Sequence, residues 1–197
     1  AWKKGKNKKK LFVIGNYNFL KKQINNIGLN VKILKINALK DIKDFKKLNI
    51  LNVPFKFKSL FENNITNTKD YLYKSLNLAH SLAITKKIKG FINAPINKKN
   101  FGSKYLGVTE YLAYKNNVKN KEVMMIYNKK LSVVPLTTHV EIKNVTNKIT
   151  ANLIKAKVLT LNKSYLKLFK SNPKIAILGL NPHNSENRKN SIESKII

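Results

Sequence analysis

Segments that resemble β-strands alternate with segments that resemble α-helices along this chain, and this alternation is the feature that most constrains its fold. Parallel strands need a crossover of a dozen or more residues, which is usually an α-helix. The order therefore predicts an α/β fold with a largely parallel sheet. No internal repeat and no dividing linker is visible, so we expect a single incomplete α/β unit over residues 1–197.

The first third of the chain shows a strand, a helix and a second strand. The helix is predicted over Tyr17–Ile27, where apolar residues recur at helical spacing, and Gly28 is its C-cap. The stretch 40–64 is poorly patterned apart from one short strand. Strands are predicted at Lys10–Gly15, Val31–Ile36 and Asn52–Phe57.

The clearest helix of the first half is predicted over Thr66–Lys87, because it starts at a polar cap and carries an apolar stripe. His80 sits beside that stripe, so we interpret it as a helix-surface or satisfied interior residue and not as a metal ligand. A short buried strand is predicted next, at Gly90–Pro95.

The second half repeats the alternation with a hairpin inserted. Two strands are predicted to pair across the turn at residues 128–130, and a long amphipathic helix leads into the last strand. The predicted helices are Thr109–Asn116 and Asn147–Phe169, and the predicted strands are Glu122–Tyr127, Leu131–Thr137 and Ile175–Leu180.

Two histidines, His139 and His183, stand where apolar, strand-like runs stop. Ligands collect beyond the carboxyl ends of parallel strands, and imidazole is a common metal ligand. The chain has three histidines and no cysteine, so a shared metal is one interpretation of this pair. The alternative is that a histidine at the end of a strand simply hydrogen-bonds a loop.

A formal net charge of +31 would attract phosphates. Arg188 is the only arginine, and the lysines are spread evenly, whereas proteins that grip nucleic acid cluster their basic residues. A basic nucleic-acid-binding protein is therefore the less favoured alternative. The positive electrostatic field of the chain would also attract an anionic small substrate.

The composition also bears on the cellular compartment in which the protein is found. Without cysteine there are no disulfides and no thiolate metal sites. No apolar run reaches the roughly 18 residues that span a bilayer, and Leu11–Gly15 after the basic start indicates a strand and not a signal peptide. We expect a cytoplasmic protein.

Four short segments follow one another along the chain: Ala94-Pro-Ile-Asn-Lys98, Gly107-Val-Thr-Glu110, Thr137-Thr-His139 and Gly179-Leu-Asn-Pro-His183. In that order and at these spacings they resemble the 4-hydroxythreonine-4-phosphate dehydrogenase family of vitamin B6 (pyridoxal phosphate) biosynthesis. Val123-Met-Met125 is a weaker match in the same order. The resemblance covers nearly the whole chain, but only the middle of the family, so it implies a fragment that lacks both ends. It implies a sandwich like that of isocitrate and isopropylmalate dehydrogenases.

The resemblance implies a metal site and a redox reaction. Three histidines hold a divalent metal in that family, and two of them match His139 and His183; the third is expected in the absent C-terminal portion. Zinc, cobalt, magnesium or manganese would act as a Lewis acid on the substrate's C3 hydroxyl, and NAD or NADP would accept the hydride. The product, 2-amino-3-oxo-4-phosphonooxybutanoate, would then decarboxylate to 3-amino-2-oxopropyl phosphate.

The resemblance further implies a homodimer with active sites at the subunit interface, and an inactive isolated fragment. No Gly-x-Gly-x-x-Gly follows any strand, so cofactor-binding residues cannot be named.

The substrate residues implied by the resemblance depart from the family pattern at one position. Val108 replaces a substrate-contacting histidine, while Thr109 keeps its hydroxyl and Lys98 could steer the phosphate. Losing a charge-capable hydrogen bond costs about 1.5 to 3 kcal/mol of binding. A related dehydrogenase or decarboxylase for another hydroxy acid is therefore the main alternative.

Several neighbours of these motifs have structural interpretations. Asn181 and Pro182 are expected to shape the turn that carries His183. Thr137 and Thr138 could hydrogen-bond to the histidines, or could reflect ordinary β-propensity. Extra carboxylates near the site that we do not assign as ligands are Glu110, Glu141 and Glu186.

Overall fold

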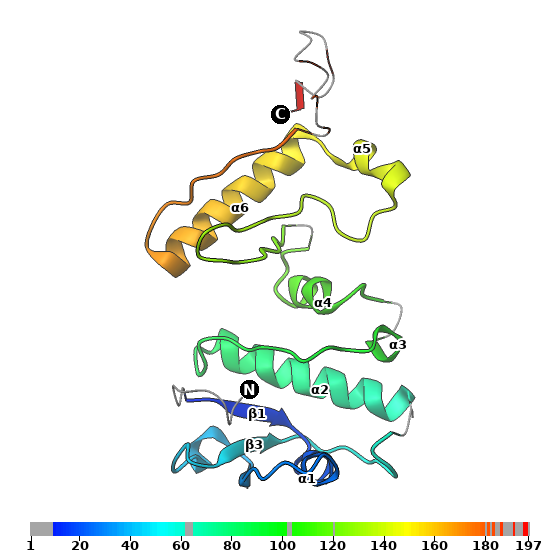
Figure 1. Cartoon of the computed structure of the whole chain (residues 1–197), viewed down its shortest axis with the longest axis vertical. Helices are drawn as coiled ribbons and strands as arrows, with labels where there is room; N and C mark the ends of the chain where they lie inside the picture. The colour runs from blue at the N-terminus through cyan, green and yellow to red at the C-terminus, as the bar shows by residue number, and fades with distance from the viewer. Residues whose placement is uncertain are drawn as a thin grey trace. The chain divides into compact units, whose positions relative to one another are not determined.

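The computed structural model of the protein describes residues 10–61, 65–101, 104–119, 121–179, 181, 183, 186, 191, 195 and 196. The chain is organised as two compact units, Ala1–Lys104 and Tyr105–Ile197. The first contains the sheet, and the second is built around one long helix (Figure 1). The expectation of a single incomplete unit stays a prediction, because this division does not test whether either half folds alone.

The sheet of the first unit has three parallel strands in the order β1-β3-β2. Phe12 pairs with Asn49 at one end of β1, and Ile33 of β2 pairs with Leu48. The parallel arrangement confirms the α/β prediction. The strands are β1 (Phe12–Gly15), β2 (Ile33–Ile36) and β3 (Leu48–Asn52).

The first two strands and the helix between them lie where the sequence predicts them, whereas the third does not. The strand predicted at Asn52–Phe57 was wrong, because β3 ends at Asn52. Asn49, Ile50 and Leu51 of β3 are its buried residues. Beyond them Pro54 has no N–H for a ladder, and the phenylalanines that follow pack on α1.

Helix α1 (Tyr17–Asn26) is capped by Asn16, whose side-chain oxygen accepts the Phe19 N–H at 2.9 Å. Gly28 follows the helix with a φ of +64°, which confirms its predicted role at the C-terminus. The start of α1 is thus fixed by one buried polar side chain.

Four aromatic rings join α1, the segment after β3 and the long helix α2 (Ile65–Ile84). Phe19 meets Phe55 and Phe57 edge to face, and Phe55 stacks on Tyr71 at 4.6 Å. The Tyr71 hydroxyl accepts the Asn16 N–H at 2.8 Å. A Cβ on Gly15 would lie 3.0 Å from that hydroxyl, so glycine permits this close approach.

Helix α2 confirms the helix predicted in this part of the chain and lies along the sheet (Figure 1). Leu76, Ala79 and Leu82 are buried on this helix, and Leu82 packs with Ile36 and Leu51. His80 is half-buried on α2. Connecting turns include η1 (Leu39–Asp41), and the first unit ends with α3 (Lys98–Phe101).

The buried strand predicted at Gly90–Pro95 was wrong. Residues 90–95 are irregular, and Ile92 is 93% exposed. A strand buried on both faces needs a neighbouring strand and covering layers. Within the part of the chain that the structure describes, nothing pairs with this segment.

In the described residues 105–170, the second unit has two substantial helices and two short ones. Thr150 caps α6, because its hydroxyl accepts the Leu153 N–H at 3.2 Å, so the helix begins later than predicted. Lys170, with a φ of 59°, ends it. The elements are α4 (Val108–Lys115), η2 (Ile142–Asn144), α5 (Val145–Lys148) and α6 (Ala151–Phe169).

The strands predicted for the second unit are largely unformed. The hairpin at Glu122–Tyr127 and Leu131–Thr137 is reduced to one antiparallel bridge, Ile126 to Val133, with N···O distances of 2.9 and 3.0 Å. The strand predicted at Ile175–Leu180 was also wrong, since residues 175–179 form no strand; Leu180 lies outside the described residues. Apart from the bridge between Ile126 and Val133, no described segment pairs with these runs as a neighbouring strand.

No helix within the described stretches is both long and apolar enough to cross a membrane.

Candidate functional site

His139 lies on the irregular segment that leads to η2, and it has a left-handed backbone with a φ of 56°. Its side chain is exposed. The left-handed conformation raises the free energy of a residue other than glycine by about 1–2 kcal/mol, although histidine is among the types that adopt it more often. A sharp turn therefore holds a solvent-accessible imidazole, and its strain is the kind that concentrates at functional sites.

His183 is exposed and sits in a tight turn that its neighbours build. Its N–H donates to the Asn181 Oδ1 at 3.0 Å, and its carbonyl accepts the Glu186 N–H at 2.7 Å. This side-chain-to-backbone contact confirms that Asn181 shapes the turn. Pro182 lies outside the described residues.

Both candidate metal ligands belong to the second unit. In the described part of the chain no hydrogen bond joins the two imidazoles, and no group of three or more His, Cys, Asp or Glu residues could hold a metal ion. Two accessible imidazoles suit a divalent metal chemically. Their convergence on one ion stays a prediction.

Val108 and Thr109 form the first turn of α4, directly after its N-cap, Gly107. Thr109 is exposed and Val108 is half-buried. Glu110 folds back over the turn, with its Oε2 3.2 Å from the position of a Cβ on Gly107. A carboxylate at a helix N-terminus interacts favourably with the helix dipole, which gives Glu110 a structural role.

Lys98 begins α3 in the first unit, whereas the other candidate residues lie in the second. Helix α3 is fixed against α2, because the Tyr73 hydroxyl donates to the Phe101 carbonyl at 2.7 Å and their rings stack at 5.4 Å. Phe101 is only 2% exposed. The helix that starts at Lys98 is therefore anchored at its other end.

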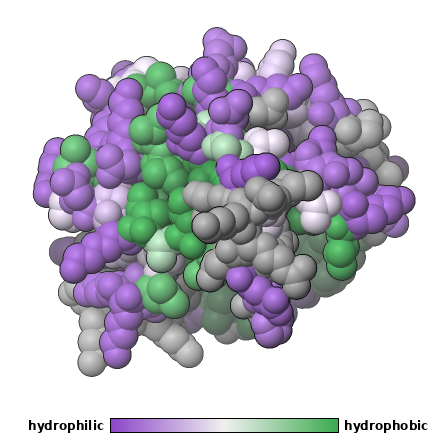
Figure 2. All heavy atoms as spheres, turned by 90° about the horizontal axis from the view of Figure 1, so that it is seen from above, coloured by the Kyte–Doolittle hydropathy of each residue, from purple (hydrophilic) through white to green (hydrophobic). Residues whose placement is uncertain are grey.

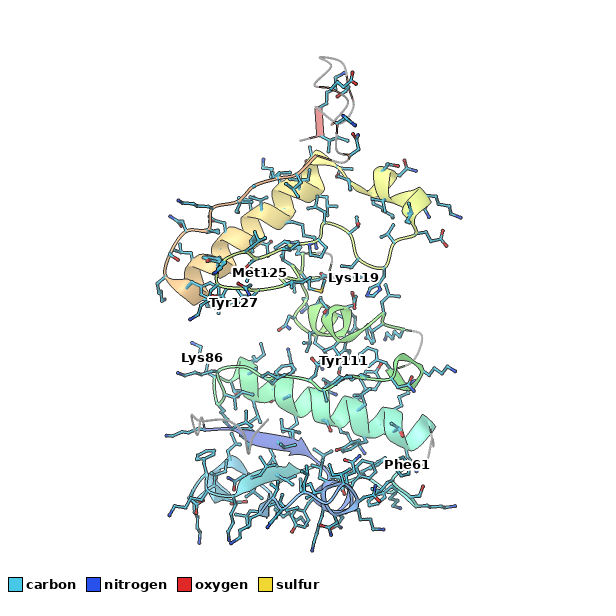
Figure 3. The ribbon with its side chains drawn as sticks, viewed as in Figure 1. Phe61, Lys86, Tyr111, Lys119, Met125 and Tyr127 are labelled. Carbon is cyan, nitrogen blue, oxygen red and sulfur yellow. The ribbon has the colours of Figure 1, made fainter. Side chains whose placement is uncertain are left out.

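Helix α6 organises the second unit through contacts that the sequence pattern does not reveal. The Lys157 Nζ donates to the Glu122 carbonyl, and Tyr127 stacks on Phe169 with a centroid distance of 5.1 Å. Met125 and Tyr127 both come from the strand-like segment that accompanies α6 (Figure 3). Nothing in the sequence distinguishes Lys157, which is half-buried, from the many other lysines of the chain.

A family model described as "Pyridoxal phosphate biosynthetic protein PdxA" matches residues 7–197. A protein of Hydrogenobaculum sp., named 4-hydroxythreonine-4-phosphate dehydrogenase, is 34% identical over 177 residues, which cover 88% of this chain and 56% of that protein. A protein of Pectobacterium atrosepticum, named D-threonate 4-phosphate dehydrogenase, is 26% identical over 71% of this chain and 44% of its own length.

The fold matches a solved structure as well. The crystal structure of 4-hydroxythreonine-4-phosphate dehydrogenase from Klebsiella pneumoniae superposes with a TM-score of 0.80 at 23% identity, over 89% of this chain and 56% of that one. The chain thus spans about half the length of the relatives that it matches.

Proposed function

Because the chain belongs to the pyridoxal phosphate biosynthetic protein PdxA family, we propose that the whole protein is a metal-dependent dehydrogenase of 4-phosphooxy-L-threonine. It would transfer hydride to NAD or NADP and form 2-amino-3-oxo-4-phosphonooxybutanoate, which loses carbon dioxide to give 3-amino-2-oxopropyl phosphate. The observation that carries this proposal is the family match over residues 7–197, which includes both candidate histidines.

His139 and His183 would hold the divalent metal, zinc, cobalt, magnesium or manganese, through their exposed imidazoles. When bound, such a metal supplies Lewis-acid polarisation of a substrate oxygen. A third ligand and the cofactor-binding residues would come from the part of the family fold that this chain does not span. A fragment with two ligands would be inactive alone.

Thr109 and Lys98 would contact the substrate, the first through its exposed hydroxyl and the second through its charge. The net charge of +31 would raise the local concentration of a phosphorylated substrate. The active protein would be a cytoplasmic homodimer with its sites at the subunit interface.

Val108 favours a second candidate function. Its half-buried isopropyl group on the first turn of α4 cannot hydrogen-bond a polar substrate group. A related hydroxy acid phosphate, such as the D-threonate 4-phosphate of the Pectobacterium atrosepticum relative, would then be the substrate.

Reduction of NAD and NADP by the whole protein, with each phosphorylated acid and a divalent metal, tests both functions. We expect preference for 4-phosphooxy-L-threonine and loss of turnover in the His139→Ala and His183→Ala variants. His80→Ala is the matched control, because it removes the remaining histidine from α2. Preference for D-threonate 4-phosphate would favour the second function, and turnover that survives both histidine variants would contradict the first.

A further inference from the structure

The first turn of α4 has no side-chain cap. Its N-cap is Gly107, which has no side chain that could accept a hydrogen bond from the helix. Helix α4 has eight residues, and isolated helices shorter than about 12–15 residues are marginal in water. Contacts from outside the helix must therefore hold its first turn, which carries Val108 and Thr109.

Tyr105 supplies such a contact. It is half-buried and precedes the N-cap of α4 by two residues. Its ring meets Tyr111 edge to face with a centroid distance of 5.2 Å, and it meets Tyr114 at 5.5 Å. Because Tyr111 and Tyr114 lie one turn apart on the same helix face, the chain before α4 folds back onto the helix that it leads into. This arrangement fixes the entry of the chain as a hydrophobic staple does.

Tyr111 is a fixed partner for that ring. It is 5% exposed and lies on α4 (Figure 3), and its N–H donates to the Gly107 carbonyl at 3.1 Å. Figure 2 shows that other apolar side chains of the protein are open to solvent, on the face seen from above. Tyr111 differs from these, because it is buried and its N–H also closes the first turn of the helix.

The direction of the Thr109 side chain depends on this first turn. Successive side chains of an α-helix point roughly 100° apart, so the face on which Tyr111 is buried sets the direction of Thr109. Val108 precedes Tyr111 by one turn and is half-buried, whereas Thr109 is exposed. The ring contacts of Tyr105 therefore hold the exposed hydroxyl in one orientation relative to the buried face of α4.

We propose that Tyr105 is a positioning residue, whose ring holds the first turn of α4 and so directs the Thr109 hydroxyl toward the phosphorylated substrate. This inference rests on the proposed function, in which Thr109 contacts that substrate. The Tyr105 ring would touch α4 and not the substrate. A hydroxyl that is displaced by a fraction of an ångström binds its partner less well, and binding groups need support from packed neighbours.

Glu110 is the other residue that could fix this turn. Its Oε2 lies 3.2 Å from the position of a Cβ on Gly107, and its carboxylate interacts with the helix dipole. That interaction is electrostatic and weakens as salt is added. An aromatic pair depends little on salt and favours the packed arrangement by about twofold to tenfold. The two pairs of Tyr105 together favour it by about fourfold to a hundredfold.

Amide hydrogen exchange of the 197-residue chain, followed by NMR at high salt, tests the packing step. We expect the Tyr111 amide, whose hydrogen bond closes the first turn, to exchange at least about fourfold faster in Tyr105→Ala. Tyr105→Phe keeps the ring and should exchange as the unchanged chain does. Tyr127→Ala is the matched control, because it removes a ring of the same unit that stacks on Phe169 instead. Unchanged exchange in Tyr105→Ala would overturn the inference, as would equal acceleration in both alanine variants.

Kinetics of the whole protein test the link to the substrate. Tyr105→Ala should raise the KM for 4-phosphooxy-L-threonine at least about fourfold and change kcat by less than about twofold, because it weakens binding and not chemistry. Tyr105→Phe and Tyr127→Ala should leave KM unchanged. Adding Thr109→Ala to Tyr105→Ala should raise KM no further, since Tyr105 acts through Thr109.

An unchanged KM in Tyr105→Ala would overturn the inference. So would a further rise of KM in the double variant that equals the rise in Thr109→Ala alone. Failure of the proposed function gives a different result, because the whole protein would then not oxidise 4-phosphooxy-L-threonine even without a substitution. The exchange rate of the Tyr111 amide would still show whether Tyr105 holds the first turn.

Discussion

Replacing Asn16 with alanine should destabilise the first unit by about 2–4 kcal/mol, the sum of two lost interactions. The Asn16 side-chain oxygen accepts the Phe19 N–H at 2.9 Å as the N-cap of α1, and its Nδ2 donates to the Val53 carbonyl at 3.1 Å. The residue is 6% exposed. Loss of a cap costs about 1 kcal/mol, and a buried carbonyl left without its donor costs about 1–3 kcal/mol.

Urea unfolding of the 197-residue chain measures the loss, and two further variants separate its parts. Asn16→Ser keeps a cap acceptor but is too short to reach Val53, so it should recover about 1 kcal/mol relative to alanine. Asn18→Ala removes an exposed asparagine of α1 and is the matched control, expected to stay within about 0.5 kcal/mol of the unchanged protein. Equal stability of Asn16→Ala and Asn18→Ala would refute this reasoning.

Two further predictions concern single residues. The backbone N–H groups of Ala38 and Asn37 donate to the Asp41 carboxylate and hold its pKa below the ordinary value of 3.8. The resulting stabilisation of the folded chain is present above the ordinary pKa and disappears as the pH falls through the pKa of the folded state. NMR titration should therefore find the Asp41 midpoint below 3.8, and a midpoint at or above 3.8 would contradict this. His139 has a left-handed backbone, so His139→Gly should be more stable than His139→Ala by about 1 kcal/mol in thermal unfolding, and equal stability of the two would show that the turn is unstrained.

The sequence predicted the segment from β1 to β2 well because its elements are local. Tyr17–Asn26 carries its own cap and terminator, and the strands on either side are short apolar runs bounded by polar residues. The third strand was misplaced because Phe55 and Phe57 resemble strand residues. They pack instead against Phe19, a contact between distant positions that no local pattern records.

In the second unit the strand predictions failed, because strand formation depends on distant segments. Ile175 and its neighbours have a strand pattern, but a strand exists only when another segment pairs with it, and the described residues offer none. The sequence also identified His139 and His183 as candidates without revealing that His139 has a left-handed backbone, because the conformation depends on the surrounding turn. The hydrogen bond from the Lys157 side chain to the Glu122 carbonyl could not be predicted either, since no local pattern distinguishes that lysine from the others.

The central functional claim is that His139 and His183 hold one divalent ion, and calorimetric titration with Co²⁺ tests it most directly. We expect the 197-residue chain to bind one Co²⁺ and each alanine variant to lose at least tenfold in affinity, while the double variant loses little more than either single one. His80→Ala should bind as the unchanged chain does. Independent, additive losses at the two positions, or an equal loss in His80→Ala, would contradict a shared ion.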